Sequence, residues 1–227
     1  MEPPGPGGTH KTMGVDHYPN RDHAARVLAD ELSGRDWRDP VVLGIPRGGV
    51  PMARIVAERL GAAFDVVLVH KIRAPGHPEY AIGSVDETGT VALNPRSGYK
   101  SDDPGVSDEI ASEKALLGRR RRRYGRPRVA LNGREAIIVD DGAATGATVS
   151  AAIRAARHAG AGEVVVALGV ADAVVVNDLA GQADQVICPC QPAAFMAVSQ
   201  AYDRFDQVTD AEVERLLGVA DAARGNE

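Results

Sequence analysis

Two adjacent carboxylates, followed by a run of small and hydroxylated residues, are the part of this sequence best suited to chemistry. Asp140 and Asp141 directly follow the apolar stretch 136–139, and the loop after them opens into an alanine-rich helical pattern. Small side chains let backbone N–H groups approach an anion, and a helix N-terminus adds a favourable dipole. The residues expected to hold a phosphate in this way are Gly142, Ala143, Ala144, Thr145, Gly146, Ala147 and Thr148.

The acidic pair suits a different part of a ligand. Carboxylates repel phosphate, but they accept hydrogen bonds from vicinal hydroxyl groups and they bind Mg²⁺. A phosphate on one side and a diol on the other describe a ribose 5-phosphate. The alternative is an acid pair that precedes an ordinary turn and a helix N-cap.

A second glycine-rich loop, 46–49, follows the apolar run 41–45. Its Arg47 offers a guanidinium fork that matches a diphosphate, and Gly48 and Gly49 are expected to expose backbone N–H groups. Taken alone, these residues are better explained as a Gly-Gly turn beside a solvated arginine. The presence of the first loop favours the phosphate-binding interpretation.

The apolar run, the two acids and the Thr-Gly-x-Thr of 136–148 are similar to the motif with which type I phosphoribosyltransferases bind phosphoribosyl pyrophosphate (PRPP). The segment 44–50 resembles the pyrophosphate loop of that family, and 70–73 resembles the start of its flexible lid. The likeness covers nearly the whole chain from about Tyr18 and points to a bacterial branch of stand-alone phosphoribosyltransferases. For Lys71, in the lid segment, an ordinary surface cation at a strand end is an equal alternative.

This resemblance implies an enzyme that moves ribose 5-phosphate from Mg-PRPP to a nitrogenous, nucleobase-like acceptor and releases pyrophosphate. The implied catalytic residues are Asp140, Asp141, Lys71 and Arg47. Gly48 and Gly49 complete the implied pyrophosphate loop. Mg²⁺, the implied cofactor, would bridge pyrophosphate and ribose oxygens with few direct protein ligands, for which Asp140 and Asp141 are the candidates.

The resemblance also implies that a hood over the acceptor is built from the chain ends, 18–37 and 187–217. Within it, Phe195 and Tyr202 would stack on a flat base, or alternatively anchor the tail to the sheet. Ala144 stands where the 6-oxopurine enzymes of the family carry a third acid, and here the loop resembles the adenine type. Guanine and hypoxanthine are therefore less expected as acceptors, and any general base must come from elsewhere.

The elements that must position these residues alternate along the chain. Short apolar runs predict buried strands, and segments with helical spacing lie between them. The expected strands are 41–45, 64–69, 134–139, 164–170 and 185–188, and the expected helices are 22–32, 50–60, 108–123, 149–159 and 210–217. This order predicts an α/β fold with a doubly wound, mainly parallel sheet, which binds ligands at the carboxyl ends of its strands. A mobile loop, 73–79, and a hairpin of 80–85 with 90–93 are expected to form the lid.

Length and charge narrow the possibilities further. The 227 residues suit one domain, expected at 18–227 with its core at about 38–190, behind a disordered tail at 1–17. The formal net charge of −5 gives no general attraction to nucleic acid or anionic membrane. The N-terminus has no secretory pattern and no stretch approaches a membrane span of about 20 apolar residues, so the expected compartment is the cytoplasm. A homodimer is the default assembly.

Two other functions fit the same scaffold. One is a regulatory protein that senses PRPP or a nucleotide, and the arginine run 119–123 is the only feature that favours it. The simpler explanation of that run is a basic helix end with a solvated face. The other function is a phosphoribosyl hydrolase that uses water as the acceptor, which pyrophosphate release without any base would reveal.

Overall fold

Five strands form a central sheet in the computed structural model, which describes residues 15–125 and 128–218. The strands are β1 (Pro40–Gly44), β2 (Ala63–Val66), β6 (Glu135–Ala143), β7 (Glu163–Ala171) and β8 (Gln185–Ile187). Their order is β2-β1-β6-β7-β8, and every neighbouring pair is parallel. The expected α/β fold with a mainly parallel sheet is therefore confirmed.

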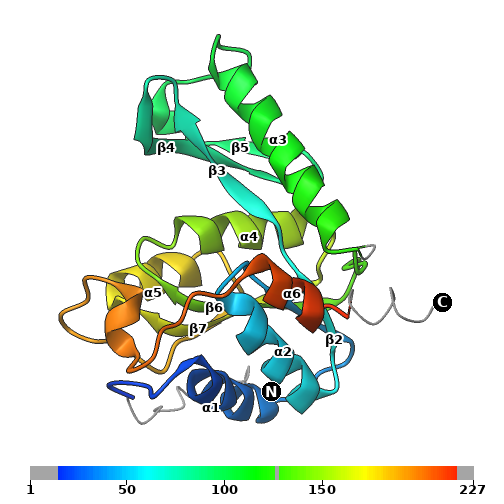
Figure 1. Ribbon diagram of the computed structural model, residues 1–227, viewed down its shortest axis with the longest axis vertical. Coiled ribbons are helices and arrows are strands. Elements are labelled where there is room, and N and C mark those ends of the chain that lie inside the picture. Colours follow the sequence, from blue (N-terminus) through cyan, green and yellow to red (C-terminus); the bar gives the residue numbers. More distant parts are fainter. Residues whose placement is uncertain (1–14, 126–127, 219–227) are drawn as a thin grey trace, which may run out of the picture.

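Helices cover both faces of this sheet (Figure 1). One face carries α1 (Arg21–Ser33) and α2 (Gly49–Leu60), and the other carries α4 (Ala147–His158) and α5 (Ala173–Ala180). Because successive side chains of a strand point to opposite faces, each strand supplies both layers of the core. In β6, Ile137 and Val139 pack with the α1 and α2 side, whereas Ala136 and Ile138 pack with the α4 side. Burial on both faces explains why the strands are continuously apolar.

A second, smaller sheet stands apart from the central one (Figure 1). It consists of β3 (Val69–Ala74), β4 (His77–Asp86) and β5 (Val91–Leu93), which pair antiparallel in that order, and α3 (Val106–Arg123) packs along it. A short 3-10 turn, η1 (Pro95–Ser97), follows β5. We call β3, β4, β5 and α3 the lid.

Two expectations about the lid were wrong. The expected strand 64–69 is divided, because β2 ends at Val66 and β3 begins in the other sheet at Val69. The expected mobile loop 73–79 consists mostly of strand residues joined by a tight turn at Pro75 and Gly76, where Gly76 has φ +76°. Positive φ costs glycine little, so two residues suffice to reverse the chain and let both strands run into the turn.

Residues 15–18, the start of the described chain, lie beside residues 189–203 of the C-terminal segment. A 3-10 turn, η2 (Val198–Ala201), and α6 (Asp210–Leu216) belong to the C-terminal segment, and α6 packs beside α2. Most of the expected disordered tail, 1–17, lies outside the described residues, but Val15 donates its N–H to Pro189 O at 3.2 Å and His17 Nε2 lies 2.8 Å from Asp203 Oδ1. In the part of the chain that the structure describes, no helix has the length and apolar character needed to cross a membrane.

Candidate active site

The acidic pair lies at the carboxyl end of β6, in the middle of the sheet. β6 pairs with β7 as far as Ala143, so Gly142 and Ala143, expected in a loop, are strand residues. The neighbouring long strand β7 continues the ladder of hydrogen bonds past Asp140. The loop between β6 and α4 therefore consists only of residues 144–146, so the acids lie close to the N-terminus of α4.

The two glycine-rich loops meet at this acidic pair. A Cβ atom added to Gly48 would lie 1.9 Å from Asp141 Oδ2, and one added to Gly49 would lie 2.4 Å from Val139 O. The expectation that Gly49 exposes its N–H was wrong, because that group donates to Ile45 O at 3.0 Å inside the loop. These glycines instead let the backbone between β1 and α2 touch the end of β6.

Two helices start at this edge without a side-chain cap. Gly48 precedes α2 and Gly146, with φ +68°, precedes α4, and neither helix start has a capping hydrogen bond from a side chain of the described residues. The N-caps of α1, α5 and α6 are occupied by Asn20, Asp172 and Thr209, each of which accepts a backbone N–H. The start of α4 presents N–H groups and a positive dipole to an anionic group. At the start of α2 the dipole has the same direction, but Gly49 and Val50 already donate to Ile45 O and Arg47 O, and Pro51 has no N–H.

Arg21, to which the sequence analysis gave no role, is the basic partner of the acidic pair. At the start of α1, its Nε donates to Asp141 Oδ2 at 2.9 Å and its Nη2 lies 2.8 Å from the same oxygen. Its Nη1 donates to Asp206 O at 2.6 Å, and its guanidinium lies 3.7 Å from the centre of the Phe205 ring. Arg21 and Asp141 are separated by 120 positions, so no local sequence signal could have joined them.

Both carboxyl groups are held away from water. Burial, followed by repulsion from Asp141, raises the pKa of Asp140 well above its usual value. Burial also raises the pKa of Asp141, while the Arg21 guanidinium acts in the opposite direction. One arginine therefore faces two buried carboxyl groups, which leaves the pair in need of positive charge or hydrogen-bond donors from a ligand.

The cations expected to hold pyrophosphate are divided between two places. Lys71, on β3, lines a cavity together with Pro46 and Thr148, so the structure brings the lid, the β1–α2 loop and the start of α4 to one space. The Arg47 side chain is 37% exposed, and its Nη1 lies 3.9 Å from Asp210 Oδ2 in α6. Lys71 thus borders the loops directly, whereas Arg47 is turned toward the C-terminal helix.

The two aromatic residues expected to stack on an acceptor differ in exposure. Tyr202 is 5% exposed, its ring is stacked between Tyr18 at 5.6 Å and Phe205 at 5.1 Å, and its hydroxyl donates to Asp141 O at 2.6 Å. Because other rings cover both of its faces, Tyr202 does not offer a stacking surface, and its hydroxyl instead binds the backbone of Asp141. Phe195 is half-buried and packs against the core.

The arginine run 119–123 does not form one basic patch. Arg121 Nη1 donates at 2.9 Å to Asp65, which is 2% exposed, and the same guanidinium binds Glu87. Arg123 pairs with Glu214 and with Asp210 of the C-terminal segment. Arg121 and Arg123 thus attach the lid to the core, whereas Arg119 and Arg122 are exposed.

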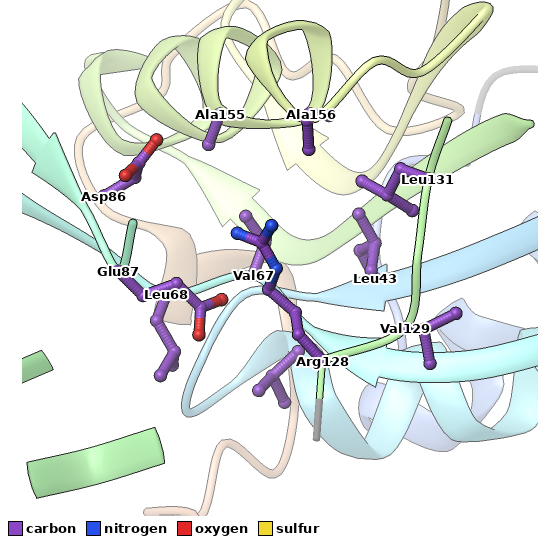
Figure 2. Close-up of a pocket in the computed structure, with 12 residues that line it drawn as sticks. Leu43, Val67, Leu68, Asp86, Glu87, Arg128, Val129, Leu131, Ala155 and Ala156 are labelled. Atoms are coloured by element: carbon purple, nitrogen blue, oxygen red, sulfur yellow. The ribbon is translucent and has the colours of Figure 1, made fainter. Parts of the chain in front are cut away.

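A further crevice, largely apolar, lies between α4 and the ends of β1 and β2 (Figure 2). Ala155 and Ala156 face Leu43 across it. The two acids at its edge have partners already, since Asp86 accepts N–H groups of the following turn and Glu87 binds Arg121. The Arg128 guanidinium points into the crevice (Figure 2), so this space carries a cation and lacks the free acidic pair found at the end of β6.

Within residues 15–125 and 128–218, no group of three or more His, Cys, Asp or Glu side chains could hold a metal ion. A metal at the candidate site would consequently need ligands from a substrate in addition to Asp140 and Asp141. This arrangement matches Mg²⁺, which in proteins is commonly held by one or two carboxylates together with substrate phosphates and water.

Comparison with known proteins shows the family to which this chain belongs. Two Mycobacterium tuberculosis proteins, whose names assign them to the phosphoribosyl transferases, are 42% identical to this chain over 204 residues, covering 88% of this chain and 46% of each relative. The chain thus spans about half the length of these relatives. The crystal structure of TT1426 from Thermus thermophilus shares 42% identity with a TM-score of 0.80, covering 88% of this chain and 97% of that chain. The model of the phosphoribosyl transferase domain matches residues 15–184, and the chain belongs to that family.

Proposed function

We propose that this chain transfers ribose 5-phosphate from Mg-PRPP to a nitrogenous, nucleobase-like acceptor and releases pyrophosphate. The observation that carries the proposal is the contact between the Gly48–Gly49 backbone and the Asp140–Asp141 pair, with an uncapped helix N-terminus on each side. In PRPP, the ribose hydroxyls lie between the 5′-phosphate and the pyrophosphate. At this edge of the sheet, the acidic pair likewise lies between the starts of α4 and α2.

Each part of the site has a role in this proposal. The 5′-phosphate binds at the start of α4, where Thr145 and Thr148 add hydroxyl donors to the helix dipole. Pyrophosphate binds at the start of α2, within reach of Lys71 across the shared cavity. Asp140 and Asp141 accept hydrogen bonds from the ribose hydroxyls between these two groups.

The charge balance of the acidic pair supports the same chemistry. Displacement of pyrophosphate from the ribose carbon develops positive charge on the sugar ring. Two buried carboxyl groups with one arginine partner stabilise such charge, because they are already fixed in place and poorly solvated. Asp140 and Asp141 would also be the protein ligands of Mg²⁺, which neutralises negative charge on the leaving pyrophosphate.

The experiment is calorimetric titration of Mg-PRPP into the wild type and into the Asp140→Asn/Asp141→Asn variant. Asp178→Asn, an exposed residue of α5, is a matched control for the loss of a carboxylate. We expect micromolar binding by the wild type and the control and none by the double variant. Folded wild type that does not bind Mg-PRPP would refute the proposal.

Turnover then separates the enzyme from its alternatives. Pyrophosphate release is measured with Mg-PRPP alone and with a panel of purine and pyrimidine bases. Release that depends on one base identifies the acceptor, release without a base identifies a hydrolase, and tight binding without release identifies a sensor. Two arginines of the run, Arg121 and Arg123, are paired with acids, which reduces the basic surface that would favour a sensor.

A further inference from the structure

The cavity that contains Lys71 is lined by more cations than the loop motifs account for. This cavity of about 220 Å³ lies between the lid and the start of α4. Its lining residues are Pro46, Val69, His70, Lys71, Arg73, Arg120, Thr148 and Ala151. Arg120 belongs to the arginine run of α3.

The acid beside this cavity, Glu113, already has other partners. Glu113 Oε2 lies 2.5 Å from His70 Nδ1, and Glu113 Oε1 accepts from Arg73 at 3.1 Å. Within the described residues, neither Lys71 nor Arg120 has a carboxylate oxygen within 4.0 Å. The cavity therefore carries two uncompensated positive charges in a space that opens onto the phosphate loop.

The lid holds Arg120 in this direction. Glu113 and Arg120 are seven positions apart on α3 and so lie on the same side of the helix, where Arg120 Nη1 is 3.4 Å from His70 Nε2. The next residue, Arg121, is fixed on the core by Asp65, which sets the rotation of the helix end. Arg119 and Arg122, in contrast, are exposed.

We propose that Arg120 is a binding residue for the pyrophosphate group, acting with Lys71 across this cavity; the proposal rests on the PRPP-dependent function proposed above. A planar guanidinium with several donors matches the oxygens of a diphosphate better than a single ammonium does. Arg120 and Lys71 come from α3 and β3, so the bound diphosphate is held by the lid as well as by the core loops.

The test is binding of inorganic pyrophosphate with Mg²⁺, and separately of Mg-PRPP, by calorimetry. Arg120→Gln is compared with Arg119→Gln and Arg122→Gln, which remove the same charge from exposed positions of the same helix turn. Hydrogen bonds to charged groups predict that Arg120→Gln weakens both ligands by about tenfold or more. The two controls should stay within about twofold of the wild type, and Arg120→Lys should retain part of the affinity.

A measurement on the unchanged protein covers the case of a variant that does not fold. Phenylglyoxal modification is mapped by mass spectrometry, and Mg-pyrophosphate should protect Arg120 but not Arg119. The role of Arg120 is overturned if Arg120→Gln and the controls bind with equal affinity, or if Mg-pyrophosphate does not protect Arg120. Mg-PRPP binding by the wild type would then still support the proposed function. If the wild type binds pyrophosphate but not PRPP, the proposed function is refuted and the role of Arg120 in binding pyrophosphate can still be measured. If it binds neither ligand, both proposals are refuted.

Discussion

Replacing Arg21 by Met removes the positive partner of a buried carboxylate and leaves a side chain of similar length. The Arg21 and Asp141 side chains are 12% and 13% exposed, so water cannot replace the lost contacts. The substitution also removes the hydrogen bond to Asp206 O, whereas the methionine can still pack against the Phe205 ring.

The magnitude follows from this burial. Removing one member of a buried ion pair costs about 3–5 kcal/mol, because the remaining charge keeps its desolvation penalty without its partner. The whole domain is expected to be stable by about 5–15 kcal/mol, so the effect is a large fraction of the total. We therefore expect Arg21→Met to lower the free energy of unfolding by about 3–5 kcal/mol at neutral pH.

The loss of unfolding free energy caused by Arg21→Met should depend on pH. The pKa of Asp141 is raised in the folded protein by burial, and Arg21 opposes that shift. A carboxyl group whose pKa is raised on folding loses stability as the pH increases from its unfolded value of about 3.9 through its folded value. Removing Arg21 raises the folded-state pKa of Asp141 further, so stability is lost over a wider pH range. The loss of unfolding free energy in Arg21→Met, relative to the wild type, should therefore be smallest near pH 4 and grow toward pH 7.

Urea unfolding of the wild type, Arg21→Met, Asp141→Asn and the double variant measures both effects. In the Asp141→Asn background, the carboxylate that Arg21 contacts directly is gone and only its longer-range attraction to Asp140 remains, so Arg21→Met should cost less, about 1–2 kcal/mol. A deficit of equal size in both backgrounds, or one that does not change between pH 4 and pH 7, would refute the reasoning.

Two further predictions test other parts of the structure. Gly48→Ala places a methyl group 1.9 Å from Asp141 Oδ2, so it should cost about 1–3 kcal/mol and weaken Mg-PRPP binding about tenfold by calorimetry. Gly34→Ala, whose new atom would meet nothing closer than 3.5 Å, is the control and should change stability by less than about 0.5 kcal/mol. Burial raises the pKa of the Cys188 thiol to about 12, so a thiol reagent at pH 8 should label it slowly in the native protein and quickly in urea. Rapid labelling of the native protein would contradict the buried position of Cys188.

The sequence indicated the strands of the central sheet, most of the helices that cover it and the position of the acidic pair. Buried parallel strands must be apolar on both faces, so runs such as 41–45 and 136–139 could be recognised without knowledge of their neighbours. The same property hid the break between β2 and β3, because an apolar run does not reveal where the chain leaves one sheet for another.

The partners of the charged groups became apparent only in the folded protein. Arg21 pairs with Asp141 from 120 positions away, and Arg120 reaches the Lys71 cavity because α3 is anchored on the core by its neighbour. Residue type gives an arginine its charge, but the direction of its side chain depends on how its helix packs. The sequence by itself therefore located the phosphate loops, whereas the folded chain determined which cations and which buried rings surround them.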